Sequence, residues 1–174
     1  MKELMVSQNV GGEDEKWVEG YVRELETVGE KRLEEVFGEE AKEAMRTGYA
    51  MRLRMILERK KDGRHKGRLV GQGFLEPRRM TKGREDSPVA SHSTIRAVFF
   101  GAGDESGQDD DLVGSIDVST AFLQADLYKE GECKRYATFR EYRGGPLRVF
   151  RLLGPLYGSR DSPRRWFILL RLSS

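Results

Sequence analysis

Two stretches of the chain alternate in side-chain character around a turn signal, and this pattern restricts the possible folds more than any other feature. Apolar and basic residues roughly alternate over residues 49–57, the turn-forming sequence KDGR follows, and residues 68–70 resume the extended pattern. Residues 134–140 and 147–153 have the character of two further short strands, separated by the turn signal RGGP. The sequence therefore predicts two β-hairpins, the first of them basic.

Helical periodicity is found on both sides of these hairpins. Residues 13–28 place apolar side chains at helical intervals among acids, and a second helix is expected from residue 30 to about residue 46. Serine or threonine caps predict two more helices, one ended by Gly101 and a last one capped by Ser162 with Pro163 at its first position. Together with the hairpins, these helices predict an α+β fold with an antiparallel sheet.

Length and composition exclude several classes of protein. The chain has 174 residues, enough for one domain with a core or for a piece of a larger one, and its charged fraction of 34% indicates an ionic surface. A single cysteine, Cys133, excludes an internal disulfide, and two histidines beside it are too few for a zinc site, so any metal is expected to be oxygen-bound. Since no membrane span or signal-peptide core is found, an intracellular chain without membrane contact is expected.

Charge is strongly segregated along the chain. Residues 52–84 hold 12 basic and 3 acidic residues, and residues 127–174 hold 11 basic and 4 acidic ones. Between them, residues 104–126 carry 7 acids and no base. Two basic blocks around an acidic one suit a polyanion backbone that is bound on both sides of a metal site, although such runs are more often solvated surfaces.

The segment DVSTAFL, which starts at Asp117, is the strongest candidate for chemistry. The apolar run over residues 112–116 delivers one carboxylate to the end of an expected strand, after which the chain breaks into small residues. A carboxylate held there by a rigid strand could bind a metal ion over a phosphate. Taken alone, the segment fits a turn-capping aspartate better, so the assignment depends on the other motifs of the chain.

Three separated motifs together resemble the reverse transcriptase domain of copia-type LTR retrotransposons. The family pattern KARLVxxGF is matched by KGRLVGQGF at residues 66–74, and DVxxAFLxxDL is matched by DVSTAFLQADL at residues 117–127. The third pattern, LYGxxxxPRxW, is matched by LYGSRDSPRRW at residues 156–166. The resemblance covers roughly residues 50–167 and implies an incomplete set of polymerase fingers and palm over residues 49–174, after a helical N-terminal segment over residues 1–48.

The chain also departs from the family pattern. Gly67 stands where the family has alanine, and KEGE at residues 129–132 replaces the usual acidic-aromatic segment. No segment matches the Tyr-x-Asp-Asp hairpin that supplies the family's other metal-binding aspartates, so the chain is expected to be truncated before that motif. The expected polymerase site is therefore incomplete.

The resemblance implies a role for each motif around a metal centre. Asp117 would bind two Mg²⁺ ions, with the Val118 carbonyl completing one coordination shell. Phe122 would lie under the incoming sugar and exclude a 2′-hydroxyl, although its spacing fits a core aromatic equally well.

The basic hairpin and the last helix would complete the site. Lys66 and Arg68 would bind the triphosphate of the nucleotide, whereas without the resemblance a solvated β-ribbon would be the better interpretation. Tyr157, Gly158 and Pro163 would begin the helix that supports the template base, although on their own they indicate only a helix start.

The function implied by the resemblance is RNA-directed DNA polymerisation. An RNA template, a DNA primer and dNTPs would be the partners of the intact family, with other polyprotein segments as further candidates. With one of three carboxylates, the chain itself is expected to be inactive. Two alternatives are a non-catalytic nucleic-acid-binding remnant and a decayed transposon product that does not fold stably.

Overall fold

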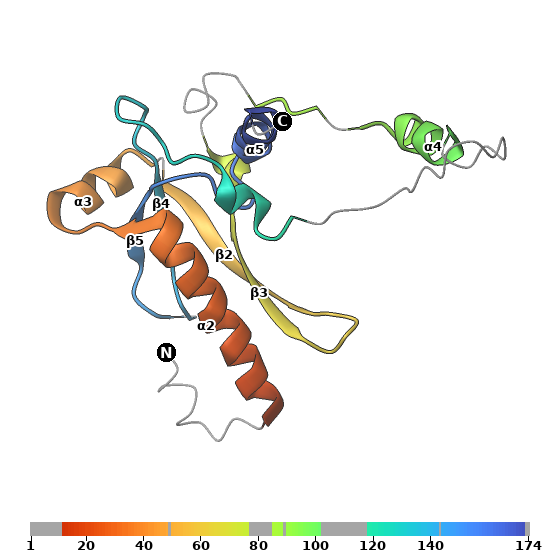
Figure 1. The fold of residues 1–174 in the computed structure, drawn as a ribbon. Coiled ribbons are helices and arrows are strands. Elements are labelled where there is room, and N and C mark those ends of the chain that lie inside the picture. Colours follow the sequence, from red (N-terminus) through yellow and green to blue (C-terminus); the bar gives the residue numbers. More distant parts are fainter. Residues whose placement is uncertain are drawn as a thin grey trace.

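The computed structural model describes residues 12–48, 50–76, 85–88, 90–101, 118–142 and 144–172. The described part of the chain contains both helices and strands (Figure 1). The elements are α2 (Gly12–Arg32), β1 (Leu33–Glu35), α3 (Gly38–Arg46), β2 (Ala50–Arg59), β3 (His65–Gly71), the 3₁₀ turn η1 (Gly73–Leu75), α4 (His92–Gly101), the 3₁₀ turn η3 (Ala121–Gln124), β4 (Tyr136–Phe139), β5 (Arg148–Leu152) and α5 (Ser162–Leu172).

The strands form one five-stranded sheet in the order β1-β5-β4-β2-β3. All neighbouring pairs are antiparallel except β2 and β4, which run parallel from Ala50 opposite Tyr136 to Arg52 opposite Thr138. The expectation of a purely antiparallel sheet is therefore wrong at this one pair, although the α+β class is confirmed. A long connection separates β2 from β4, and parallel pairing requires such a crossover.

Both predicted hairpins are confirmed. The first joins β2 to β3, pairing Leu53 with Gly71 at one end and Arg59 with His65 at the other. Its turn contains Gly63 with φ of +81°, a conformation that glycine adopts without strain. The second hairpin joins β4 to β5.

The N-terminal segment differs from the expected pair of helices. Helix α2 continues beyond residue 28 to Arg32, and the next residues form strand β1 instead of a second helix, so that α3 begins only at Gly38. Cross-strand ion pairs explain the strand, because Glu34 and Glu35 of β1 contact Arg151 and Arg148 of β5.

Helices α2 and α3 contribute to two separate core clusters of the sheet. Val28 and Tyr21 of α2 belong to the main core with residues such as Met51 and Leu69. Val149 belongs instead to a smaller cluster with Ala44 of α3. Since Val149 precedes the main-core residue Phe150 in β5, and side chains alternate along a strand, α2 and α3 lie on opposite faces.

The two predicted C-terminal helices are also confirmed. The Ser91 hydroxyl accepts a hydrogen bond from the Thr94 amide at the start of α4, as expected for a cap. Helix α5 starts at Ser162, but the Ser162 hydroxyl donates to the Leu156 carbonyl at 2.6 Å. In the described part of the chain, no helix is long and apolar enough to cross a membrane.

Candidate functional site

Asp117 and the strand expected before it lie outside the described residues. The described chain resumes at Val118, which is exposed, and turns sharply at Thr120, whose φ of +54° is left-handed. The Leu123 amide donates to the Thr120 carbonyl at 2.8 Å and closes this turn. The turn therefore positions Phe122, the third predicted site residue of this motif.

Phe122 meets a residue from a different predicted motif. Its ring lies 5.7 Å from the ring of Tyr157, centroid to centroid, with an interplanar angle of 65°. Both side chains are half-buried, whereas Leu123 next to Phe122 belongs to the main core. This edge-to-face contact joins η3 to the segment that leads into α5.

The backbone of Tyr157 and Gly158 is hydrogen-bonded to the end of β3 and the residues that follow it. The amide of Gly71 donates to the Tyr157 carbonyl at 2.7 Å, and the amide of Gly73 donates to the Gly158 carbonyl at 3.1 Å. Gly158 has φ of +83°, and a Cβ atom there would lie 2.1 Å from the Gly71 carbonyl oxygen. Only glycine permits this approach, which is between two segments of the protein itself.

Lys66 and Arg68 lie on the face of β3 that points away from α2. Lys66 is exposed, and the Arg68 guanidinium lies 3.7 Å from the carboxylate of Glu58 on β2. Val70 on the same face is in reach of Gly158, because a Cβ atom at Gly158 would lie 2.9 Å from it. The basic residues of the hairpin thus lead along one strand face toward Gly158.

Pro163 is exposed in the first turn of α5, and its carbonyl accepts a hydrogen bond from the Ser87 hydroxyl at 3.2 Å. The structure thus brings together Phe122 with Tyr157, and Gly158 with the β3 face that carries Arg68.

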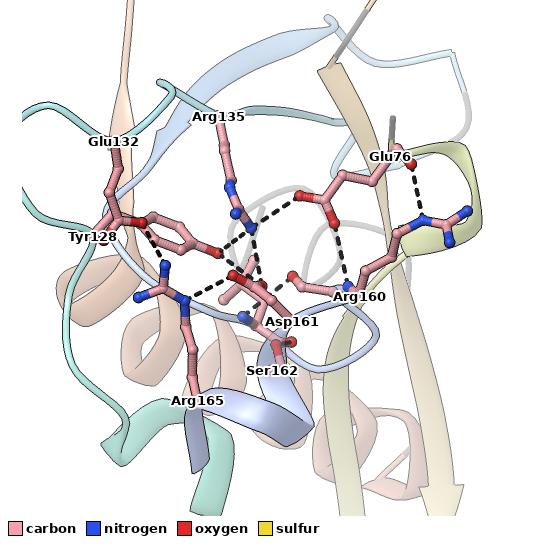
Figure 2. Close-up of polar contacts among 10 residues, drawn as sticks. Glu76, Tyr128, Glu132, Arg135, Arg160, Asp161, Ser162 and Arg165 are labelled. Atoms are coloured by element: carbon pink, nitrogen blue, oxygen red, sulfur yellow. Dashed lines mark hydrogen bonds and ion pairs between the residues drawn. The ribbon is translucent and has the colours of Figure 1, made fainter. Parts of the chain in front are cut away.

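A buried ionic cluster that the sequence did not reveal lies beside these residues (Figure 2). At its centre the Arg135 guanidinium contacts the carboxylates of Glu76 at 3.2 Å and Asp161 at 2.9 Å. The side chains of these three residues are only 4–6% exposed. Arg135 also donates to the Tyr128 hydroxyl at 3.0 Å.

A second arginine extends the cluster on its α5 side. Arg165 contacts Asp161 at 2.7 Å and also Glu132, and its guanidinium lies 4.6 Å from the centroid of the Tyr128 ring. Burial raises the pKa of the Tyr128 hydroxyl above its ordinary value. The phenol therefore stays neutral beside two guanidinium groups.

Glu76 connects the cluster to the loop that carries Tyr157 and Gly158. Its carboxylate accepts a hydrogen bond from the Arg160 amide at 3.2 Å, and its carbonyl accepts one from the Arg160 side chain at 2.9 Å. Burial raises the pKa of Glu76 in spite of the nearby Arg135. The partners are 59 and 84 residues apart in sequence, so no local pattern could have identified them.

The described residues contain no group of three or more histidine, cysteine, aspartate or glutamate side chains that could hold a metal ion. Cys133 is exposed and free. Asp117, the carboxylate predicted to bind Mg²⁺, lies outside the part of the chain that the structure describes.

Comparison with known proteins identifies the family. The model of the family "Reverse transcriptase (RNA-dependent DNA polymerase)" matches residues 43–172. This chain belongs to the reverse transcriptase family. The match includes all three motifs on which the resemblance was based, so that resemblance is confirmed.

Curated relatives agree with this assignment of the reverse transcriptase chain. It is 32% identical over 123 residues, or 68% of its length, to the Retrovirus-related Pol polyprotein from transposon TNT 1-94 of Nicotiana tabacum, of which it covers 9%. It is also 32% identical over 108 residues, or 62% of its length, to the corresponding polyproteins from transposons RE2 and RE1 of Arabidopsis thaliana, of which it covers 7%. The chain thus spans less than a tenth of these relatives. No solved structure matches it significantly.

Proposed function

We propose that this chain forms the fingers and the first part of the palm of an RNA-directed DNA polymerase from a copia-type retrotransposon. An RNA template, a DNA primer and dNTPs are its substrates, and residues 49–174 carry the polymerase part. The observation that supports this most is the meeting of the three motifs, since the end of β3 is hydrogen-bonded to Tyr157 and Gly158, and Tyr157 packs on Phe122. These segments lie far apart in sequence, and polymerase chemistry requires their residues at one place.

In this proposal, the three groups of predicted site residues contact three different parts of the substrates. Arg68 and Lys66 bind the triphosphate, the first with a bidentate guanidinium and the second with a point charge. Phe122 lies below the incoming sugar. Tyr157, Gly158 and Pro163 support the template base at the start of α5.

The metal site of this proposal is incomplete. Asp117 and the Val118 carbonyl would bind Mg²⁺, and two such ions stabilise the attacking and leaving oxygens during nucleotidyl transfer. Because the sequence contains no Tyr-x-Asp-Asp segment, the chain offers too few carboxylates for both ions. We therefore expect binding of substrates without primer extension.

Nucleotide binding tests the proposed triphosphate contacts. Binding of a fluorescent dNTP in the presence of Mg²⁺ should weaken about tenfold or more in Arg68→Ala, because one charge-assisted contact to phosphate is lost. Arg64→Ala is the matched control, since Arg64 lies in the turn of the same hairpin and pairs with Asp62. Equal losses in both variants would contradict the proposed role of Arg68.

Primer extension tests the rest of the proposal. Purified wild-type chain, given Mg²⁺, primed RNA and dNTPs, should leave the primer unextended. The Asp117→Ala variant should bind dNTP with an affinity that no longer depends on Mg²⁺. If the wild-type chain extends the primer and Asp117→Ala does not, the expectation that this chain is inactive is wrong. Salt-dependent nucleic-acid binding that weakens in Arg68→Ala, with no dNTP binding at all, would favour the non-catalytic binder instead.

A further inference from the structure

Strand β2 has a partner strand on each side, but only for part of its length. It pairs with β4 from Ala50 to Arg52, and with β3 from Leu53 to Arg59. In the described part of the chain, no strand pairs with β2 on the β4 side beyond Arg52. The sheet therefore splits at this point into the β2–β3 hairpin and the β4–β5 hairpin.

The hydrogen bonds of the first hairpin show which backbone groups of β2 face the split. The Arg52 carbonyl accepts a hydrogen bond from the Gln72 amide at 2.9 Å, so Arg52 points its backbone groups toward the β3 side. Hydrogen-bonded pairs alternate with non-bonded pairs along an antiparallel ladder, so Met55 and Leu57 point theirs the other way, into the split. The register partner of Met55 agrees, because the Leu69 amide also points out of the hairpin and donates to a carboxylate of α2 at 2.9 Å.

Two hollows lie at the split, and both have Leu53 and Arg140 in their linings. The smaller hollow, of about 390 Å³, is lined by Tyr21 of α2 and by Met55, so it opens on the face that α2 covers. The larger hollow, of about 640 Å³, is lined by Met45 at the end of α3, so it opens on the opposite face. The split thus has a hollow on each face of the sheet.

The two hollows differ in chemistry. The α2-side hollow has several large apolar and aromatic side chains in its lining, and its one acid, Glu141, is already paired with Arg148. The α3-side hollow contains Arg52 and Arg140, and no acid is among its lining residues. Within the described ranges neither of these two arginines has a carboxylate partner, and Arg140 donates instead to the Gly145 carbonyl. One side of the split is therefore apolar, and the other is positively charged.

We propose that the split is a docking site for an extended segment of a partner protein, which adds to β2 as a further strand. The backbone of this segment pairs with the amides and carbonyls of Met55 and Leu57, because an unpaired strand edge accepts another chain in this way. Side chains alternate between the two faces of a strand, so every second residue enters the α2-side hollow and the others reach Arg52 and Arg140. The partner segment therefore alternates apolar and acidic residues.

The backbone groups in the split favour a polypeptide over a nucleic acid. A phosphodiester backbone has no donor for the carbonyls of Met55 and Leu57, whereas a peptide backbone carries a donor and an acceptor at each residue. The carboxylates of the partner supply the bidentate contacts that arginine forms with planar acids. The site goes beyond the proposed polymerase function because it needs neither Asp117 nor a bound nucleotide.

Fluorescence anisotropy with a labelled, acetylated peptide of sequence EVEFEVE tests the site. In an extended conformation, this peptide places its glutamates on one face and its apolar residues on the other. The peptide EEVFVEE has the same composition without the alternation, and it should bind about tenfold or more weakly. Equal binding of the two peptides would overturn the proposal.

Methylation of the peptide backbone distinguishes strand addition from contact through side chains alone. The amides of alternate residues point to the same side of a strand, so only one alternating set faces β2. One peptide carries methyl groups on the amide nitrogens of its two valines, and the other on those of its two inner glutamates. One of the two should lose binding by about tenfold or more, and the other should bind like the unmodified peptide. Equal losses, or no loss in either peptide, would overturn strand addition.

A substitution in β2 tests the same pairing from the side of the protein. Leu57→Pro removes one amide from the split without removing a hydrogen bond to β3, because Leu57 and Gly67 form a non-bonded pair. Leu57→Ala is the matched control, since it keeps the amide and removes a side chain that is 45% exposed. The proline variant should bind EVEFEVE about threefold or more weakly than the alanine variant. Circular dichroism verifies that both are folded, and equal affinities would overturn the pairing with β2.

The charged face has its own control. The double variant Arg52→Gln/Arg140→Gln should bind EVEFEVE about tenfold or more weakly at low salt, because the glutamates lose their partners. Arg23→Gln/Arg64→Gln removes the same charge from two exposed ion pairs away from the split and should bind like the wild type. Equal losses in both double variants would overturn the proposal, because binding would then follow net charge alone. A wild-type chain that binds no dNTP would disprove the proposed polymerase function without affecting these peptide measurements.

Discussion

Arg32 is a charged side chain on which the described fold depends. It is 5% exposed, and its guanidinium donates to the carbonyls of Leu123 and Ala125, the second at 2.8 Å. A Cβ atom at Gly154 would lie 2.5 Å from the same guanidinium, so a side chain at position 154 would collide with Arg32. Burial lowers the pKa of Arg32. This one residue holds η3, and with it Phe122, against the end of α2.

Arg32→Met should lower the free energy of unfolding by about 2–4 kcal/mol, because two buried carbonyls lose their donor. Urea unfolding followed by circular dichroism measures the loss. The exposed control Arg23→Met should change stability by less than about 0.5 kcal/mol, since Arg23 pairs with Glu19 in solvent. Equal effects of the two substitutions would contradict this role of Arg32.

Glu35 should make stability depend on pH. Two hydrogen bonds from Arg148, at 2.7 and 2.5 Å, lower the pKa of Glu35 below its ordinary value. A lowered folded-state pKa stabilises the protein above the unfolded value, and this contribution is lost as pH falls through the folded value.

The difference in unfolding free energy between wild type and Glu35→Gln should therefore be on the order of 1 kcal/mol at neutral pH. It should shrink as the pH falls below about 4.5, where Glu35 of the unfolded wild type becomes protonated. Urea unfolding at a series of pH values measures it. A difference that stays constant down to about pH 3 would show that the carboxylate charge does not matter.

Helix α2 and strand β3 approach each other through two glycines. A Cβ atom at Gly67 would lie 2.7 Å from the Gly20 carbonyl oxygen, and one at Gly20 would lie 2.8 Å from the His65 carbonyl oxygen. Gly67 is the position at which the resembling family has alanine. The departure from the family pattern therefore accompanies a close contact between helix and strand.

Gly67→Ala should lower the free energy of unfolding by about 1–3 kcal/mol, because backbone has to move to admit the methyl group. Gly29→Ala is the matched control within α2. A Cβ atom there meets nothing within 4 Å, and alanine in a helix should raise stability by about 0.5–1 kcal/mol. Thermal and urea unfolding of both variants measure these two changes in the free energy of unfolding, which should be opposite in sign. An unchanged free energy of unfolding in Gly67→Ala would mean that α2 can move away from β3 at no cost in stability.

The sequence predicted those elements whose causes are local. Both hairpins followed from alternation and turn composition, and α4 from its serine cap. The strand at Leu33–Glu35 was missed because its partners, Arg148 and Arg151, lie more than 100 residues away. The parallel pairing of β2 and β4 likewise depends on the path of a long connection, which no local pattern specifies.

The residues of the candidate site likewise differ in whether a local sequence pattern could predict them. Two of the motifs predicted Phe122, Tyr157 and Gly158 as site residues, and the structure brings these residues to one region, beside the end of the third motif. The charges of Arg135 and Asp161 are indistinguishable from solvated ones in the sequence, because their burial results from the meeting of segments far apart. The roles proposed for all the predicted site residues stay predictions, whether or not the structure brings them together; these residues are Lys66, Arg68, Asp117, Val118, Phe122, Tyr157, Gly158 and Pro163.

The buried ionic cluster joins distant parts of the described fold. Glu76 follows the basic hairpin, Arg135 precedes β4, and Asp161 precedes α5, so one set of contacts joins three parts of the chain (Figure 2). Arg135→Met should lower the free energy of unfolding by about 3–5 kcal/mol, because two buried carboxylates lose their partner. Urea unfolding measures this loss.

A double-mutant cycle separates the cluster from simple loss of packing. Arg135→Met/Glu76→Met should cost at least about 1 kcal/mol less than the sum of the two single substitutions, since removing both partners leaves fewer unpaired charges. Strictly additive costs would show that Arg135 and Glu76 do not depend on each other.

The outer border of β3 has a consequence for how copies of this protein meet. The amides of Leu69, Gly71 and Gly73 are all taken, the first by the Glu24 carboxylate and the others by the Tyr157 and Gly158 carbonyls. An incoming chain finds no free donor along that stretch and cannot extend the sheet there. Even at high concentration, copies of this protein should not pair their sheets through residues 69–73.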